Sequence, residues 1–307
     1  MSPVIDWFTD PLQYAFMQRA LAEVVIMGAV TGIVGAYIVL RGLSFIGDAL
    51  SHAIFPGIVA AFLLGHNIFW GALVFGLITS FAIGVVSTSQ RVKEDTAIGV
   101  MFAGAFALGI VLISSSHNFT RDLASFLFGN VLGVTREDIV LSSVVGAGVI
   151  VAVLLFYREL LITSFDRVAA QAMGIRVFWM DMLLLLLITL TIIVSLRAVG
   201  NILVLAMLVT PAAAARQLTD RLPVMMLLSG IIGSGSGVIG LFVSFHQDVA
   251  AGGTIVLVAT VIFMAVWLFS PQHGLLTTRV LQRRMAGGLQ AESTVLYESA
   301  QLHPPGH

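Results

Sequence analysis

Long apolar runs are the feature that most restricts the fold of this chain. Nine runs approach the roughly 20 residues that an α-helix needs to cross a bilayer, and they are Ala20–Leu40, Leu43–Leu64, Ile68–Ser89, Thr96–Ser115, Ile139–Tyr157, Phe178–Leu196, Val199–Ala215, Pro223–Phe245 and Thr254–Phe269. The run Val199–Ala215 contains Asn201 and Pro211, so it also fits a re-entrant segment. Because backbone polar groups must be satisfied internally in lipid, we predict an all-α polytopic membrane helix bundle with eight or nine transmembrane helices.

Composition agrees with membrane insertion and narrows the chemistry. Of 307 residues, 58% are hydrophobic and 10% are charged, far from the averages of soluble domains. A net charge of −1 gives no field that would attract nucleic acid. The chain has no cysteine, which removes disulfides and thiolate sites and leaves His, Asp and Glu as metal ligands. No cleavable signal pattern precedes the first run, so that run would itself direct insertion.

The positions of Lys and Arg predict the orientation. With nine spans, most of the 15 Lys and Arg residues fall in one set of connections, and only Arg19, Arg121, Arg136 and Arg197 fall in the other. Since basic residues favour the cytoplasmic side, we expect the N-terminus outside and the C-terminus inside. Residues 1–271 would form the transmembrane domain, and residues 272–307, which include His273, His303 and His307, a mobile cytoplasmic tail.

Asp48 and His52 stand out within the second apolar run. They are four residues apart, so a helix would place both on one face. Ionisable side chains at membrane depth are costly and indicate a functional site. A carboxylate and an imidazole make half of a divalent-metal site. The alternative from chemistry alone is an ion pair or hydrogen bond that locks two helices together.

Two further sites with ionisable residues, one after the eighth apolar run and one within the first, are candidates for metal contact or for an ion pair. His246 and Asp248 form a second His/carboxylate pair, which we place in a short loop at the outer end of the eighth run. They would join a metal path only if that loop folded toward Asp48 and His52. Glu23 lies midway along the first run, and its four-residue spacing from Arg19 predicts an ion pair.

The connection from Arg158 to Arg176 contains a short predicted helix, Asp166–Met173. Asp166 suits its N-terminus, and Gly174 suits its end. A short helix with a small apolar face can dock in a groove of a soluble partner; the alternative is a helix that rests on lipid headgroups. The other charged inner connection, Gln90–Asp95, is typical of a solvated flank.

Several motifs occur in the order seen in one transporter family. They are Phe16-Met17-Gln18-Arg19-Ala20-Leu21, the block Leu40–Ala53 around Asp48 and His52, Glu94-Asp95-Thr96-Ala97-Ile98-Gly99, Leu127-Phe128-Gly129-Asn130, Val209-Thr210-Pro211-Ala212-Ala213 and Gly253-Thr254-Ile255-Val256-Leu257. From about Met17 to Pro271, the chain resembles the zinc/manganese/iron permease family of bacterial ABC transporters. The family often has Pro-Ser-Gly-Ala where this chain reads Ala250-Ala251-Gly252-Gly253, a departure that bears on His246.

The resemblance implies a multi-pass permease homodimer in the bacterial inner membrane. It implies two cytoplasmic ATP-binding subunits and an extracytoplasmic metal-binding protein as partners. Asp48 and His52 match the family's metal-contacting positions, and His246 and Asp248 are secondary candidates. The segment Phe165–Ile175, with Asp166, Arg167, Ala170, Met173 and Gly174, matches the helix that docks on the ATPase. Zn²⁺ or Mn²⁺, and with them Fe²⁺, would be transported cargo, with no stably bound cofactor.

Two other classes of function are less well supported by the residues. A proton-coupled secondary transporter or channel would use Asp48 and His52 as a proton relay but has less use for a docking helix. An intramembrane enzyme lacks its motifs, because no His-Glu-x-x-His or Gly-x-Ser-x-Gly sequence occurs. The chain also has no Gly-x-x-x-x-Gly-Lys-Ser/Thr loop, so we expect ATP hydrolysis in a separate subunit.

Overall fold

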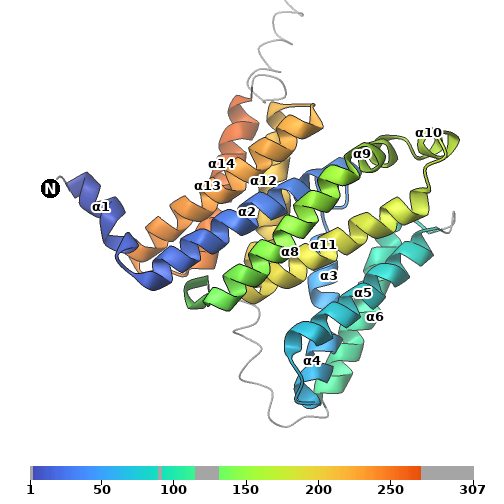
Figure 1. Ribbon diagram of the computed structural model, residues 1–307, viewed down its shortest axis with the longest axis horizontal. Helices are drawn as coiled ribbons and strands as arrows, with labels where there is room; N and C mark the ends of the chain where they lie inside the picture. The colour runs from blue at the N-terminus through green and yellow to red at the C-terminus, as the bar shows by residue number, and fades with distance from the viewer. Residues whose placement is uncertain (1–2, 89–91, 115–130, 271–307) are drawn as a thin grey trace, which may run out of the picture.

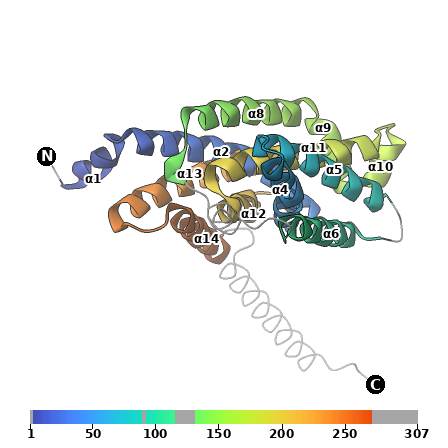
Figure 2. The ribbon, with the colours of Figure 1, turned by 90° about the horizontal axis from the view of Figure 1, so that it is seen from below.

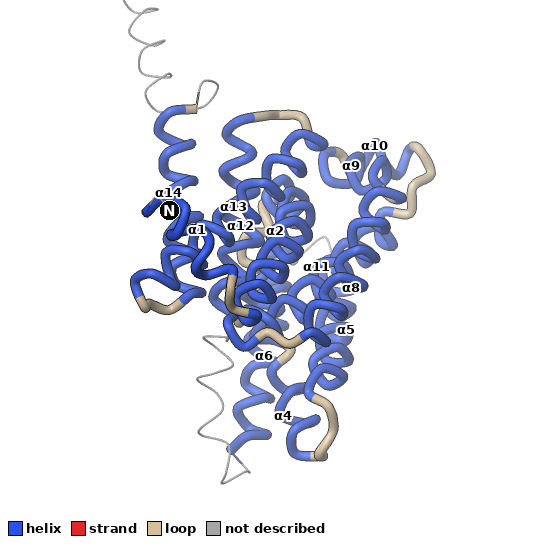
Figure 3. Tube along the Cα trace, turned by 60° about the vertical axis from the view of Figure 1, so that its left-hand side comes forward, coloured by secondary structure: helices blue, strands red, loops and turns tan. Residues whose placement is uncertain are grey.

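A computed structural model describes residues 3–88, 92–114 and 131–270, and these residues form helices joined by short loops (Figures 1 and 3). The tail beyond Ser270, the segment Phe126–Asn130 and part of Gln90–Asp95 lie outside the described residues. The helices are α1 (Pro3–Leu12), α2 (Ala15–Arg41), α3 (Ile46–Ala53), α4 (Phe55–Leu63), α5 (Ile68–Ser87), α6 (Glu94–Ser114), the 3₁₀ turn η1 (Val131–Gly133), α8 (Arg136–Leu155), α9 (Tyr157–Phe165), α10 (Arg167–Ala172), α11 (Val177–Val199), α12 (Asn201–Leu218), α13 (Leu222–Gln247) and α14 (Ala251–Phe269).

Eight segments are long and apolar enough to cross a membrane: α2, α3 with α4, α5, α6, α8, most of α11, α13 and α14. This confirms the prediction of an all-α polytopic bundle. The atypical run is a continuous helix, α12, with Pro211 inside it, and its apolar part, Leu203–Leu218, is shorter than the other eight. Whether α12 crosses the membrane therefore determines whether the chain has eight or nine transmembrane helices.

The core of the bundle surrounds α2, which packs against α8, α11, α12 and α13 (Figure 1). Glycines allow the closest of these approaches: a Cβ atom on Gly28 would collide with the backbone of Ser234 in α13, and one on Gly32 with that of Gly230. Small residues let membrane helices approach closely. The helices α3 to α6 form a second group on the far side of α11 (Figures 1 and 2).

The second apolar run, predicted as one span, forms two helices, α3 and α4. The regular helix is interrupted between α3 and α4 at Ile54, although Ile54 keeps helical φ and ψ angles of −77° and −13°. Pro56 explains the interruption, because proline has no N–H to bond the carbonyl of His52, four residues earlier. The site-bearing segment is thus a short helix, α3, with its own packing environment.

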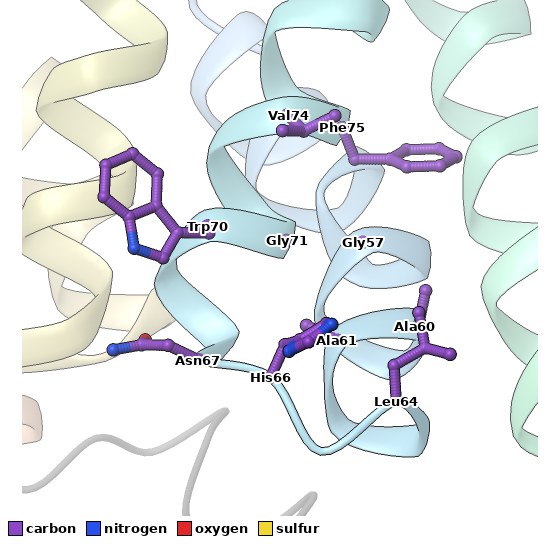
Figure 4. A pocket seen from close by; sticks show the side chains of 10 residues that line it. All are labelled: Gly57, Ala60, Ala61, Leu64, His66, Asn67, Trp70, Gly71, Val74 and Phe75. Carbon is purple, nitrogen blue, oxygen red and sulfur yellow. The ribbon is translucent and has the colours of Figure 1, made fainter.

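The crossing of α4 and α5 depends on two glycines that face each other, Gly57 and Gly71 (Figure 4). A Cβ atom on either would collide with the carbonyl oxygen of the other. An open hollow of about 390 Å³ lies beside this crossing, and His66 and Asn67 are the polar residues among its mainly apolar lining. A single histidine without a carboxylate does not make a metal site, so we assign this hollow no ligand.

Replacing Gly57 by valine should force α4 and α5 apart. Overpacking a close contact typically costs about 1–3 kcal/mol, so we expect a lower midpoint of thermal unfolding in detergent. Gly104→Val in α6 is the matched control, because a Cβ atom there meets nothing within 4 Å. Equal midpoints for the two variants would contradict the assignment.

Candidate metal site

The short helix α3 has one buried face and one open face. Ile46, Leu50 and Ala53 are fully buried, where α3 packs against α5, α6, α11 and α12. Asp48 and His52 lie on the other face, with 44% and 26% of their side chains exposed. The apolar residues of α3 therefore orient the two ionisable ones away from the packed core.

The distance between the two side chains suits joint binding of one cation. Asp48 Oδ1 and His52 Nε2 are 3.4 Å apart, too long for a strong hydrogen bond. Two ligands that each lie about 2.1 Å from one ion are roughly 3.0 Å apart in octahedral and 3.4 Å apart in tetrahedral geometry. A metal ion can thus sit between these atoms without a change of backbone. Asp48 also lies in the first turn of α3.

Aromatic side chains of α6 hold the imidazole in place. The ring of Phe106 meets the His52 ring edge-on at a centroid distance of 5.4 Å, and that of Phe102 lies 5.8 Å away. Phe106 also packs on Phe55 at the start of α4. The orientation of His52 is therefore tied to the position of α6.

The second His/carboxylate pair has a different local structure from the predicted one. His246 is not in a loop but in the last turn of α13, and Asp248 caps that helix with a positive φ of 51°. His246 Nδ1 hydrogen-bonds the carbonyl of Phe242 at 2.8 Å, and Trp7 of α1 stacks on its ring at 4.5 Å. Among residues 3–88, 92–114 and 131–270, no three His, Asp or Glu side chains are close enough to share a metal.

Glu23 does not pair with Arg19 as predicted. It is fully buried in α2, and Ser142 of α8 donates a 2.6 Å hydrogen bond to its Oε1. Arg19 instead donates to the carbonyl of Ala15. The geometry makes this carboxyl a link between α2 and α8.

The short helix at the end of the bundle forms as predicted. Asp166 accepts 2.9 Å hydrogen bonds from the backbone of Val168 and Ala169, α10 follows, and Gly174 ends it with a φ of 79°. Ala170 is fully buried, whereas Val168 and Met173 are 77% and 56% exposed. Exposed apolar side chains at the tip of a bundle, held by a well-capped helix, are available to contact another molecule. In Figure 1, α9 and α10 lie beside the upper ends of α8 and α11.

An ionic network beside α10 was not predicted. Arg41, the last residue of α2, donates to Asp181 of α11 at 2.6 Å and to the hydroxyls of Ser164 and Thr163 of α9. Arg167 of α10 contacts Glu94 of α6 at 3.0 Å and Asp181 at 3.5 Å. Asp181, an ionisable residue within the apolar run Phe178–Leu196, is the feature of the sequence that could have indicated this network.

Comparisons with known proteins agree with this architecture. A profile of the ABC 3 transport family matches residues 13–270. The manganese transport system membrane protein MntC of Halalkalibacterium halodurans is 46% identical over 277 residues, which are 90% of this chain and 95% of that protein. The manganese import system permease protein ScaB of Streptococcus gordonii is 43% identical and covers 87% of this chain and 96% of its own length.

Solved structures show the same relationship. The chain is similar to one in PsaBC from Streptococcus pneumoniae in complex with Fab, with a TM-score of 0.78 and 39% identity over 90% of this chain and 99% of that one. An inward-facing putative metal-chelate type ABC transporter shares the fold at 15% identity, with a TM-score of 0.67 over 81% of this chain and 85% of that one. The family profile spans most of the chain, and the helical bundle is the same, so this protein belongs to the ABC 3 transport family.

Proposed function

We propose that this chain is the membrane-spanning permease subunit of an ATP-driven importer of divalent transition metals, with Mn²⁺ as its principal cargo. The pair of Asp48 and His52 on the open face of α3 is the observation that carries the proposal. A carboxylate and an imidazole within a membrane span suit Mn²⁺, Zn²⁺ and Fe²⁺, and the names of the manganese transport relatives favour Mn²⁺.

The geometry suggests how the ion would pass. An extracytoplasmic metal-binding protein would release the ion at the outer mouth, and Asp48 and His52 would hold it while it loses part of its water shell. Two ligands from one chain bind weakly enough for release, which transport sites require. The open face of α3 leaves room for a second copy of the permease, so we expect a homodimer. His246 and Asp248, at the end of α13, remain secondary candidates for contact with the entering ion.

The remaining parts of the chain fit the same assembly. With the permease in the inner membrane of a bacterial cell and its C-terminus inside, α10 would face the cytoplasm and dock on a separate, cytoplasmic ATP-binding subunit. Residues 1–271 would form the permease domain, and residues 272–307 a cytoplasmic tail. ATP-driven movement of α10 would switch the pore between outward and inward access. No cofactor is needed in this scheme, because the metal ion is the substrate.

The test is metal-resolved uptake in a bacterial strain that lacks its own Mn²⁺ and Zn²⁺ importers. The permease is expressed with its ATP-binding subunit and its binding protein, and cellular Mn, Zn and Fe are measured by elemental analysis. We expect Mn²⁺ to accumulate only when the ATP-binding subunit is active. Accumulation with an inactive ATP-binding subunit would favour the proton-coupled carrier instead, and no accumulation of any of the three metals would refute both.

A further inference from the structure

We propose that Arg167 is the positioning residue through which displacement of α10 reaches Asp48 and His52, and that the Arg41–Asp181 pair is its fixed anchor. The inference rests on the proposed function and adds to it the physical connection between the docking helix and the metal site. Four charged side chains from four helices carry it: Arg41 of α2, Glu94 of α6, Arg167 of α10 and Asp181 of α11.

The anchor is the buried half of this network. Only 5% of the Arg41 side chain and 17% of the Asp181 side chain are exposed, and their nearest atoms are 2.6 Å apart. The guanidinium group also donates to Ser164 Oγ at 3.0 Å and to Thr163 Oγ1 at 3.1 Å. A guanidinium group that donates to three different side chains holds its partners in one geometry. Asp181 is therefore a fixed point in α11.

Arg167 belongs to the exposed half. Its side chain is 45% exposed, and the same nitrogen lies 3.0 Å from Glu94 Oε2 and 3.5 Å from Asp181 Oδ2. Pairs with this much contact with water add little net stability, so they can break and re-form without unfolding the bundle. The guanidinium group of Arg167 therefore connects α10 both to the fixed carboxylate of Asp181 in α11 and to the carboxylate of Glu94 in α6.

Two short paths lead from these carboxylates to the metal site. On one side, Asp181 holds Arg41, and only the residues from Gly42 to Phe45 separate Arg41 from α3. That turn is tight, because the N–H of Gly42 bonds Val39 O at 3.2 Å and the N–H of Leu43 bonds Ile38 O at 3.0 Å. The anchored Arg41 thus holds the start of α3, the helix that carries Asp48, in place.

The other path runs along α6. Glu94 is the first residue of α6. The rings of Phe102 and Phe106 in the same helix pack against the His52 ring, with centroid distances of 5.8 and 5.4 Å. A helix moves as a stiff rod over this distance, so a pull on Glu94 changes the support of the imidazole. The two paths end on Asp48 and on His52 respectively, and Arg167 is where they meet. Movement of α10 can therefore change the separation of the two ligands.

Glu94→Gln is the sharpest variant, because it removes one charge from a partly exposed pair and leaves the buried anchor intact. The permease variant is reconstituted in liposomes with its ATP-binding subunit and binding protein, and Mn²⁺ entry is measured with a trapped fluorescent indicator beside phosphate release. We expect the complex to assemble and hydrolyse ATP, with Mn²⁺ imported per ATP lowered roughly two- to thirtyfold, the range for residues that couple distant sites.

Charge reversal separates this role from a merely structural one. Glu94→Arg alone should lower import per ATP at least as much as Glu94→Gln, and Glu94→Arg combined with Arg167→Glu should recover part of the loss, because the exchange restores the pair between residues 94 and 167 but not the contact with Asp181. Asp220→Asn is the matched control, because Asp220 forms a 3.0 Å pair with Arg216, four residues earlier, that is also partly exposed; we expect wild-type coupling.

Each outcome has a defined meaning. Import per ATP within twofold of wild type in Glu94→Gln, or no recovery in the doubly reversed variant, would overturn the role of Arg167. Failure of the wild-type complex to import Mn²⁺ would count against the proposed function itself.

Discussion

Removal of either Asp48 or His52 should abolish metal import while the protein still folds and assembles. We expect Asp48→Ala and His52→Ala each to lower Mn²⁺ uptake by at least about tenfold, because even the loss of a group that only supports a metal ligand commonly costs 10–100-fold in affinity. Both side chains lie on the open face of α3, so their removal leaves the packed face of the helix intact. Uptake is measured as initial Mn²⁺ entry in the importer-deficient strain.

Two matched substitutions control for general damage. Asp10→Ala removes an exposed carboxylate from α1, and His66→Ala removes an exposed imidazole from the turn between α4 and α5. Neither should change uptake. The double variant of Asp48 and His52 should lose little more than either single variant, because two ligands of one ion act as a unit. Normal uptake by both single variants would remove the two residues from the transport path.

Local sequence patterns predicted the parts of the structure that local chemistry determines. The helix α10 begins after Asp166 and ends before Gly174 because a side-chain cap and a left-handed glycine act within a few residues. Asp48 and His52 share a face because four-residue spacing in a helix is enough to bring them together. The same reasoning should have found the break at Ile54, since Pro56 was visible in the run and a proline removes a backbone donor.

Contacts between distant segments could not be predicted in this way. Arg41 and Asp181 are 140 residues apart, and no local rule pairs them, although each is an ionisable residue at or within an apolar run. The pairing of Glu23 was wrong for the same reason: four-residue spacing favoured Arg19, whereas tertiary packing placed Ser142 against it. We placed His246 in a loop because it follows the apolar run Pro223–Phe245, but α13 continues through Gln247.

The exposed apolar face of α10 should prove to be the docking surface for the ATP-binding subunit. Replacing both Val168 and Met173 by aspartate puts two charges where an apolar contact is expected, and unpaired charges in an interface are strongly unfavourable. Their side chains are largely exposed, so the fold of the permease should be unchanged. We expect co-purification of the ATP-binding subunit to fall severalfold, and ATP-dependent Mn²⁺ uptake to fall with it.

A milder variant tests coupling rather than docking. Asp166→Ala removes both capping bonds to the backbone of α10, a loss of about 1 kcal/mol in helix stability. We expect the complex to persist but to import less Mn²⁺ per ATP, because a frayed helix transmits motion poorly. For the double aspartate variant of Val168 and Met173, the control for added charge is Val224→Asp, at an exposed apolar position in the first turn of α13. If both α10 variants retain the ATP-binding subunit and couple normally, α10 is not the docking helix, and its exposed face contacts lipid headgroups instead.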